Sequence, residues 1–226
     1  MSVARSSRRS LWIQRVVTLV LSASLLGLLY GYLVDRTAQV APRSPGPIPV
    51  YSAALPDSTW ERLLGRGHLI GRPDARDTLV VFSDYECPIC AATAPLLDSL
   101  LVHRPYVAVL HRHFPLSSHP YALDEAVAVE CAARLGRLAA GQALLYSQRG
   151  TPVDPERVAV RLGLDPSRFA ECWYGEEARA AVEDDLALAR SLDLPGTPGV
   201  FYAGRSWSHF PHAEELFRLI GPSSER

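Results

Sequence analysis

Cys87 and Cys90 are separated by Pro88 and Ile89 and follow a run of strand-forming residues at positions 78–83. The residues after Cys87 predict a helix, so the CxxC would open that helix. Unpaired backbone N–H groups and the positive end of the helix dipole favour a thiolate there. Pro88 suits the first turn, where a missing N–H costs nothing. The spacing therefore predicts thiol–disulfide exchange, with Cys87 as the nucleophile and Cys90 as the resolving thiol.

Two other interpretations of the CxxC are weaker. Structural zinc usually needs four Cys or His ligands in two paired clusters, and the sequence has no second CxxC or HxxxH. A purely structural disulfide across so short a loop would restrict the unfolded chain little and so stabilise little. Redox chemistry is the favoured interpretation.

The histidines give one arrangement that is compatible with part of a metal site. His111 and His113 are two apart on a predicted strand and so face the same side. No carboxylate or thiol at suitable spacing completes a ligand set, and we expect neither a metal nor another cofactor. His119 precedes a helical region and could lie nearer the CxxC, but the pattern assigns it no role.

The N-terminus predicts a membrane anchor. Residues 16–34 contain no charge and nearly match the thickness of a bilayer core, and arginines at 5, 8, 9 and 15 precede them. We therefore expect a cytoplasmic tail at 1–15, a single-pass signal anchor at 16–34, and a domain outside the cytoplasm. The alternative is a cleaved signal peptide, but Gln39-Val40-Ala41 is a poor cleavage site, which favours retention.

Composition excludes one class of partner. Residues 37–226 carry 18 arginines and 23 acidic residues, a net charge of −5. No basic stripe for DNA or RNA is visible, so no nucleic-acid partner is expected. The sequence has no coiled-coil heptads, and we expect a monomer.

The elements that position the CxxC predict an α/β fold. A Pro-rich linker at 35–59 would precede a domain at 60–226. Within it, 60–69 is interpreted as a short helix or turn, and the loop 71–74 leads into the first strand. The predicted elements then follow as a strand at 78–83, a helix to about 101, a strand at 106–114, about four helices at 121–192, a strand at 199–202, a turn, a short strand at 206–207 and a helix at 213–220. This is a βαβ unit and a ββα unit with a helical insertion at about 118–192.

Four motifs together resemble the thioredoxin-fold, DsbA-like thiol–disulfide oxidoreductases of the bacterial cell envelope. They are residues 82–90 (FSDYECPIC), 113–120 (HFPLSSHP), 130–133 (ECAA) and 196–198 (GTP). The resemblance implies that Pro198 is cis, lies beside the CxxC and keeps metals from the thiols. It also implies that Thr197 offers its backbone to a substrate peptide as a short strand, next to a loop formed by Pro88 and Ile89.

Two departures from the family pattern bear on the chemistry. The strongest oxidants carry Pro-His where this chain has Pro88-Ile89, so Cys87 should be less acidic than theirs and its disulfide less oxidising. Many relatives place a buried acid six residues before the first cysteine, where this chain has Val81. Asp84 and Glu86 are near in sequence but are expected to face elsewhere.

Cys131 and Cys172 are the remaining cysteines, both in the helical region. In an oxidising compartment two such cysteines usually pair, and some DsbA-like proteins carry a second disulfide. A bridge over about 40 residues would contribute roughly 3–4 kcal/mol. The alternative is an electron shuttle between the two pairs, which the lack of a CxxC context disfavours.

The resemblance implies an oxidase that forms disulfides in exported, cysteine-containing proteins. A quinone-linked membrane partner, DsbB-like or vitamin-K-epoxide-reductase-like (VKOR-like), would reoxidise it. One alternative is an envelope reductase or isomerase, for example in cytochrome c maturation. Another, from a different class, is a membrane-tethered peptide-binding or chaperone module without redox turnover.

Overall fold

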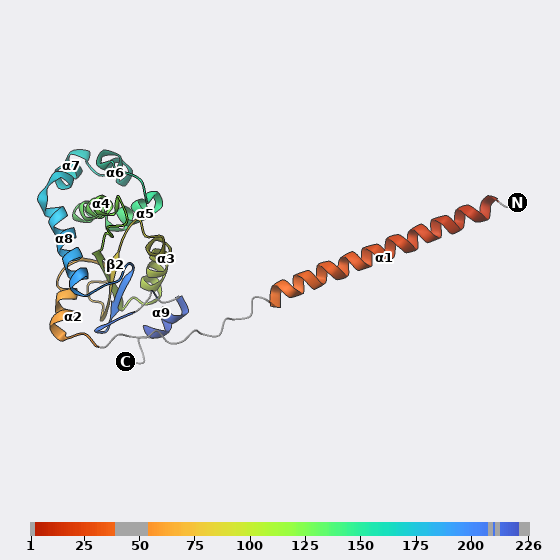
Figure 1. The fold of residues 1–226 in the computed structure, drawn as a ribbon, viewed down its shortest axis with the longest axis horizontal. Helices are drawn as coiled ribbons and strands as arrows, with labels where there is room; N and C mark the ends of the chain where they lie inside the picture. The colour runs from red at the N-terminus through yellow and green to blue at the C-terminus, as the bar shows by residue number, and fades with distance from the viewer. Residues whose placement is uncertain (1–2, 39–53, 208–209, 211–212, 222–226) are drawn as a thin grey trace. The chain divides into compact units, whose positions relative to one another are not determined.

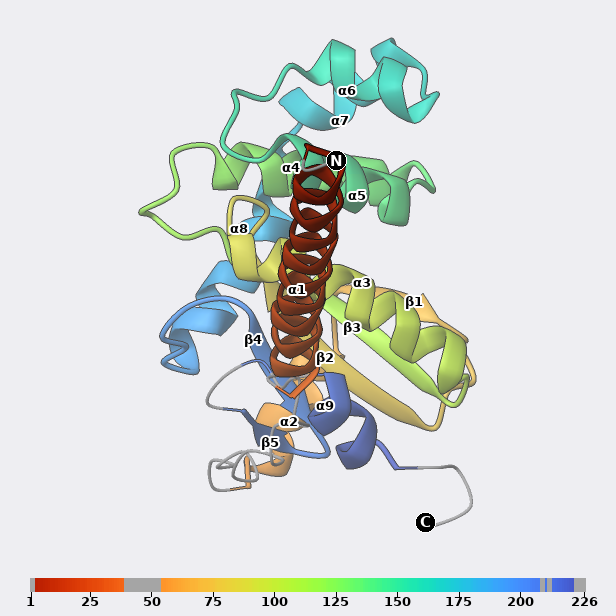
Figure 2. The same ribbon diagram turned by 90° about the vertical axis from the view of Figure 1, so that its right-hand side faces the viewer.

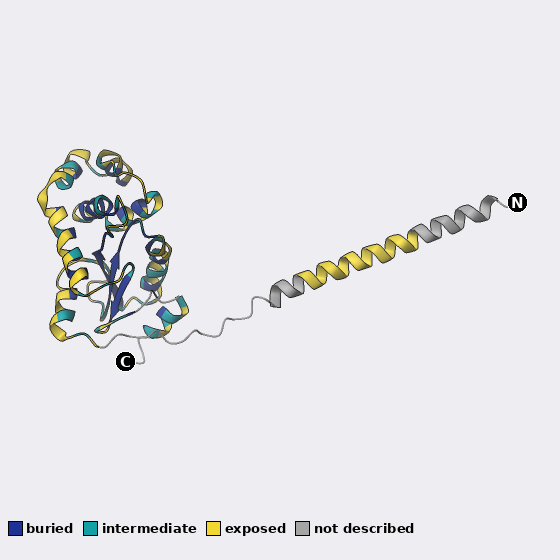
Figure 3. Ribbon diagram, viewed as in Figure 1, coloured by how far each residue is buried: buried dark blue, intermediate teal, exposed yellow. Residues whose placement is uncertain are grey.

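The structure is a computed structural model that describes residues 3–38, 54–207, 210 and 213–221. The chain divides into two units, Met1–Pro47 and Ile48–Arg226. The first contains helix α1 (Val3–Ala38), whose window Arg15–Tyr32 is long and apolar enough to cross a membrane. That window is exposed throughout (Figure 3). Most of the predicted linker, and the possible cleavage site, lie outside the described residues.

The second unit is built on a five-stranded sheet with the order β1-β3-β2-β4-β5. Strand β2 is parallel to β3, and the pairs β1–β3, β2–β4 and β4–β5 are antiparallel. The bounds are β1 (His68–Gly71), β2 (Asp77–Ser83), β3 (Val107–His113), β4 (Gly199–Tyr202) and β5 (Arg205–Ser206). With helices α3 (Pro88–His103) and α9 (Ala213–Leu219), they form the predicted βαβ and ββα units.

The prediction of a helix or turn at 60–69 was only partly correct. Helix α2 spans Asp57–Leu64, and His68–Gly71 is the edge strand β1, placed antiparallel to β3. Only the four residues His68–Gly71 pair with β3, and both Gly67, which precedes them, and Gly71 have positive φ. So short a strand is stabilised by its pairing with β3. The local sequence pattern carries no information about that distant partner.

Side chains alternate between the two faces of the sheet, as strand geometry requires. Leu79 and Val81 pack toward α3 and α9, whereas Val80 and Phe82 pack toward α2 and α8 (Glu176–Ser191). Figure 1 shows α3 and α8 on opposite sides of β2. Because both faces are covered, β2 is buried along almost its whole length.

The helical insertion between β3 and β4 has a hydrophobic core of its own. It contains five helices rather than about four, because Gly136, with φ of 77°, ends the first helix early. Figures 1 and 2 place α6 and α7 beyond α4 and α5. The bounds are α4 (Ala122–Arg134), α5 (Leu138–Gln148), α6 (Pro155–Leu162) and α7 (Pro166–Tyr174), followed by α8.

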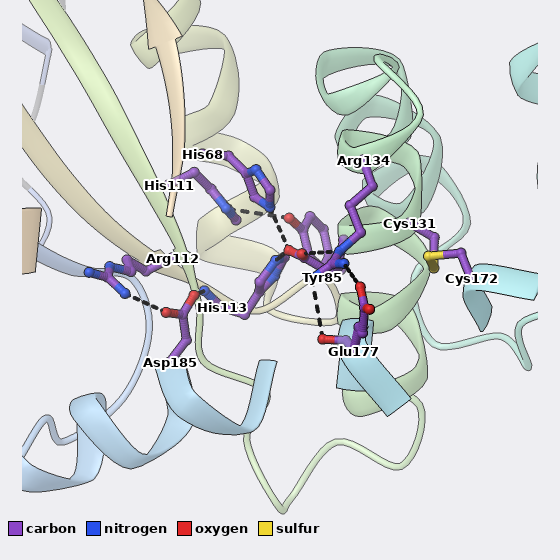
Figure 4. Close-up of polar contacts among 11 residues, drawn as sticks. His68, Tyr85, His111, Arg112, His113, Cys131, Arg134, Cys172, Glu177 and Asp185 are labelled. Carbon is purple, nitrogen blue, oxygen red and sulfur yellow. Dashed lines mark hydrogen bonds and ion pairs between the residues drawn. A yellow bond between two sulfur atoms is a disulfide. The ribbon is translucent and has the colours of Figure 1, made fainter. Parts of the chain in front are cut away.

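A buried ion pair fastens the insertion to the sheet. Arg112 of β3 contacts Asp185 of α8 through Nη1 and Oδ1 at 2.6 Å, and the side chains are 3% and 7% exposed. The Arg112 guanidinium also donates to the backbone carbonyl of Leu63, while the second oxygen of Asp185 accepts the His113 backbone N–H at 2.9 Å. Three elements, α2, β3 and α8, therefore meet at one charge pair, visible in Figure 4.

Replacing Asp185 by alanine should lower the free energy of unfolding by about 3–5 kcal/mol, because a buried guanidinium would lose its counter-charge. The measurement is guanidinium chloride unfolding of the full-length chain in detergent, followed by tryptophan fluorescence. Asp184→Ala is the matched control: its exposed carboxylate pairs with exposed Arg66, and its loss should cost less than about 1 kcal/mol. Equal losses in the two variants would contradict the role given to the buried pair.

Candidate active site

Cys87 and Cys90 lie at the start of α3, directly beyond the end of β2. Cys87 is the N-cap of the helix, and its Sγ accepts the backbone N–H of Cys90 at 3.4 Å. Pro88 occupies the first helical turn, as expected. Cys87 is 5% exposed and Cys90 1%, whereas Ile89 is 57% exposed. Ile89 thus presents an apolar surface beside the more accessible sulfur.

The two thiols are driven to opposite protonation states. The hydrogen bond from the Cys90 thiol is the largest cause that lowers the pKa of Cys87 from 9.0 to about 5. The backbone N–H groups of Ile89 and Cys90 act in the same direction, and burial opposes them. The same hydrogen bond, together with burial, raises the pKa of Cys90 far above its ordinary range. At neutral pH the reduced site holds a thiolate at Cys87 and a thiol at Cys90.

Thr197 and Pro198 lie beside the CxxC and are joined by a cis peptide bond. The Cys87 thiol, when protonated, donates to the carbonyl oxygen of Thr197 at 3.4 Å. The pairing of Phe82 with Gly199 explains this proximity, since it sets the start of β4 against the end of β2. The two segments that the sequence assigns to the active-site loop, 88–89 and 197–198, therefore both adjoin Cys87.

Asp84 and Glu86 turn away from the thiols, as expected. Asp84 Oδ2 accepts the backbone N–H of Leu116 at 2.8 Å and contacts Nδ1 of His119 at 2.8 Å. Glu86 accepts the backbone N–H of Tyr121. Burial is the largest single influence and lowers the pKa of His119, but the hydrogen bond to Asp84 and the negative charges of Asp84, Glu86 and Cys87 together outweigh it, so the pKa is raised. His119, which the sequence left without a role, thus fixes the loop that follows β3 against the CPIC segment.

A small cavity lies beneath Cys90 on the α3 face of the sheet. Its polar walls include Ser83, His111, Gln142 and Tyr146. His111 pairs with Val81, the position where many relatives carry an acid, so an imidazole on the neighbouring strand lies on the same side as that missing group. Gln142 and Tyr146 come from α5, and no local pattern connects them to the CxxC.

Cys131 and Cys172 form a disulfide that joins α4 to α7 within the helical insertion. Among the described residues, Cys87 and Cys90 are the free thiols. Cys131 and Cys172 belong to the insertion core rather than to the CPIC loop. The arrangement favours the structural role over an electron shuttle.

The rate of Cys87 alkylation by iodoacetamide in the reduced protein should be constant at neutral pH and fall as the pH drops through about 5. The thiolate of Cys87 is present above its lowered pKa of about 5 and is lost below it. The stability that it gives to the reduced fold is complete above the ordinary pKa of 9.0 and is lost as the pH falls toward about 5. Stopped-time alkylation with mass spectrometry measures this profile.

Cys90→Ala removes the largest contribution to the lowered pKa and should move the midpoint upward. A wild-type midpoint near 9, or an unchanged midpoint in the variant, would contradict the hydrogen-bond account.

Known proteins resemble this chain in two ways. A family model described as thioredoxin matches residues 64–221. Among curated proteins, a Na(+)/H(+) antiporter NhaA 1 of Mycolicibacterium gilvum is 32% identical over 208 residues, covering 89% of this chain and 32% of the relative. NhaA 3 of Salinispora tropica is 36% identical over 143 residues, covering 62% and 22%. The chain thus spans about a third or less of the length of these relatives.

Solved structures share the fold. Alpha-DsbA2 of Wolbachia pipientis is 16% identical with a TM-score of 0.66, covering 73% of this chain and 91% of that one. DsbA2 of Pseudomonas aeruginosa is 26% identical with a TM-score of 0.57, covering 66% and 88%. The catalytic domain of Proteus mirabilis ScsC is 23% identical with a TM-score of 0.60, covering 73% and 93%. With more than half of its length matched by the family model and its fold shared with DsbA-like proteins, the chain belongs to the thioredoxin family.

Proposed function

We propose that this protein is a thiol–disulfide oxidoreductase of the cell envelope that works as an oxidase. The observation that carries the proposal is the pairing of a stabilised Cys87 thiolate with a protonated, buried Cys90 at the start of α3. Such a pair exchanges two electrons with a substrate dithiol through a mixed disulfide.

In the oxidising direction a substrate thiolate attacks Cys87 Sγ of the Cys87–Cys90 disulfide. The S–S bond breaks, Cys90 leaves and takes up a proton, and a mixed disulfide joins Cys87 to the substrate. A second substrate thiolate attacks the substrate sulfur of that bond, and Cys87 leaves as a thiolate. The substrate gains a disulfide and loses two electrons, which reside on the enzyme as two reduced cysteines.

The low pKa of Cys87 favours this direction. A stabilised thiolate makes Cys87 a good leaving group and lowers the free energy of the reduced site, which makes the disulfide more oxidising. Ile89 lacks the imidazole of the strongest oxidants, and the Cys90 hydrogen bond with the helix N–H groups supplies the acidification instead. The reductase or isomerase alternative requires that the thiolate be stabilised too weakly to raise the reduction potential of the Cys87–Cys90 couple above that of thioredoxin.

The surroundings of Cys87 suit an extended peptide. The exposed side chain of Ile89 and the loop at Thr197 and Pro198 border the sulfur, and backbone pairing at Thr197 would accept varied sequences. We therefore propose cysteine-containing exported proteins as substrates. We also propose that α1 anchors the chain with the catalytic unit outside the cytoplasm, and that a quinone-linked membrane protein, DsbB-like or VKOR-like, returns it to the oxidised state.

The antiporter name of the curated relatives describes proteins about three times as long as this chain. The family match lies over residues 64–221, so we infer that the shared segment is largely the thioredoxin part of those proteins. The CPIC site supports thiol chemistry. We therefore do not propose ion exchange, the activity in the name of these relatives, for this chain.

The reduction potential of the Cys87–Cys90 couple decides the direction. In a glutathione series at pH 7, with Cys131 and Cys172 left oxidised, the full-length chain should equilibrate above about −200 mV, because the thiolate stabilises the reduced form. A value near −270 mV, that of thioredoxin, would refute the oxidase and leave a reductase.

Cys87→Ser should abolish disulfide formation in a reduced, unfolded model substrate, because the atom that is attacked is lost. Given the disulfide form of the same substrate, Cys90→Ala should instead accumulate a mixed disulfide at Cys87, visible on non-reducing gels, because Cys87 attacks the substrate disulfide and no resolving thiol releases it. A wild type that binds the substrate without forming disulfides, and a Cys87→Ser variant that binds it equally well, would favour the peptide-binding module without redox turnover.

A further inference from the structure

Two histidines and a glutamate converge away from the CPIC loop. They are His68 of β1, His113 at the end of β3 and Glu130 of α4, and their nearest ligand atoms all lie within 4.8 Å of one another. Nε2 of His68 is 2.5 Å from Glu130 Oε2, and Nε2 of His113 is 3.4 Å from the same oxygen. Figure 4 shows His68 and His113 pointing into the space between the sheet and α4.

The fold holds these side chains on rigid elements. His68 pairs with His111 across β1 and β3, and His113 lies two residues further along β3, so the histidines share one face of the sheet. Glu130 reaches them from the middle of a buried helix. The sequence predicts no metal at His111 and His113, because no carboxylate stands at suitable spacing along the chain. The structure supplies that carboxylate from the helical insertion and replaces His111 with His68.

His113 is the observation that points to a ligand. Its side chain is 1% exposed. Among the described residues Nδ1 makes no hydrogen bond, and Nε2 lies 3.4 Å from Glu130 Oε2 without forming one. A buried imidazole that makes no well-formed hydrogen bond loses its hydration and gains little in return. Its Nε2 nevertheless faces Glu130 Oε2, so an ion placed between them would satisfy both groups.

Arg134 orients the carboxylate for such a role. Its Nε donates to Glu130 Oε1 at 2.8 Å, and its Nη1 contacts Glu177 at 2.8 Å. Oε1 is thereby occupied, and Oε2 is directed toward the two histidines. Ligating carboxylates are commonly held in this way by a hydrogen bond from outside the ligand set.

The geometry points to a Zn²⁺ site formed by His68 Nε2, His113 Nε2 and Glu130 Oε2. Two imidazoles and one carboxylate suit zinc and exclude a preference for Ca²⁺ or Mg²⁺, which take oxygen ligands. Beyond the three donors lies an open pocket of about 560 Å³ lined by both His68 and Glu130, which leaves room for a water or an exogenous ligand in the fourth position.

A metal here would link the sheet to the helical insertion. The donors come from β1, β3 and α4, which span 62 residues between His68 and Glu130. Binding to the folded state alone raises its stability, so Zn²⁺ should protect the fold against unfolding. The site is separate from Cys87 and Cys90, and the proposal stands whether or not the thiol chemistry is that of an oxidase.

The test uses the full-length chain without a histidine tag, in detergent, with both cysteine pairs oxidised so that no thiolate can bind metal. After chelator treatment, Zn²⁺ is titrated in competition with a chromophoric chelator, and Co²⁺ is titrated by visible absorption. We expect one equivalent of Zn²⁺ per chain, a tetrahedral or five-coordinate Co²⁺ spectrum and a higher melting temperature with Zn²⁺.

His68→Ala should weaken Zn²⁺ binding by at least about a hundredfold, because it removes one of three donors. His68 lies at the sheet edge with its side chain 24% exposed, so this variant should fold, which circular dichroism checks. Glu130→Gln should give the same loss while keeping the shape of the side chain. His103→Ala, at an exposed histidine near the end of α3, is the matched control and should bind like the wild type.

Absence of saturable one-to-one binding to the oxidised wild type would overturn the proposal. So would undiminished Zn²⁺ affinity in folded His68→Ala or Glu130→Gln, or an equal loss in His103→Ala.

Discussion

The pairing of β2 with β4 is the constraint on which the active site depends. Phe82 opposes Gly199, so the chain that leaves β2 toward Cys87 passes the chain that enters β4 from Thr197. The CPIC segment alone would provide a helix N-terminus and two thiols. Only the strand pairing places a backbone carbonyl against the Cys87 sulfur and leaves Cys90 buried behind it. Burial of β2 on both faces makes any shift of this register costly.

Local signals predicted the parts of the fold that local physics determines. The strand at 78–83, the helix after Cys87 and the strand at 199–202 agree with the structure to within a residue or two, because alternation, apolar runs and turn residues act over short distances. The cis bond before Pro198 was expected from the family resemblance alone, since a single sequence contains no signal for it.

The features that could not be predicted from the sequence all depend on contacts between distant segments. Strand β1 exists because β3 provides its hydrogen-bond partners, and four residues carry too little pattern to reveal it. Gln142 and Tyr146 reach the cavity beneath Cys90 from α5. Glu130 meets His68 and His113 because the helical insertion folds back over the end of β3. Spacing along the chain is therefore a poor guide to the polar neighbours of a strand when an insertion supplies them.

The insertion changes the electrostatics of the thioredoxin core as well as its surface. Asp185 pairs with Arg112 on one face of β3, and Glu130 meets His113 on the other, so two carboxylates from the insertion meet polar side chains of adjacent residues in one buried strand. A strand normally excludes charge at such positions, because desolvation is costly without a partner. Arg112 and His113 are thus compatible with burial only in a chain that also carries the insertion. The core and the insertion are therefore expected to unfold together, because separating them would leave Arg112 and His113 without their carboxylate partners.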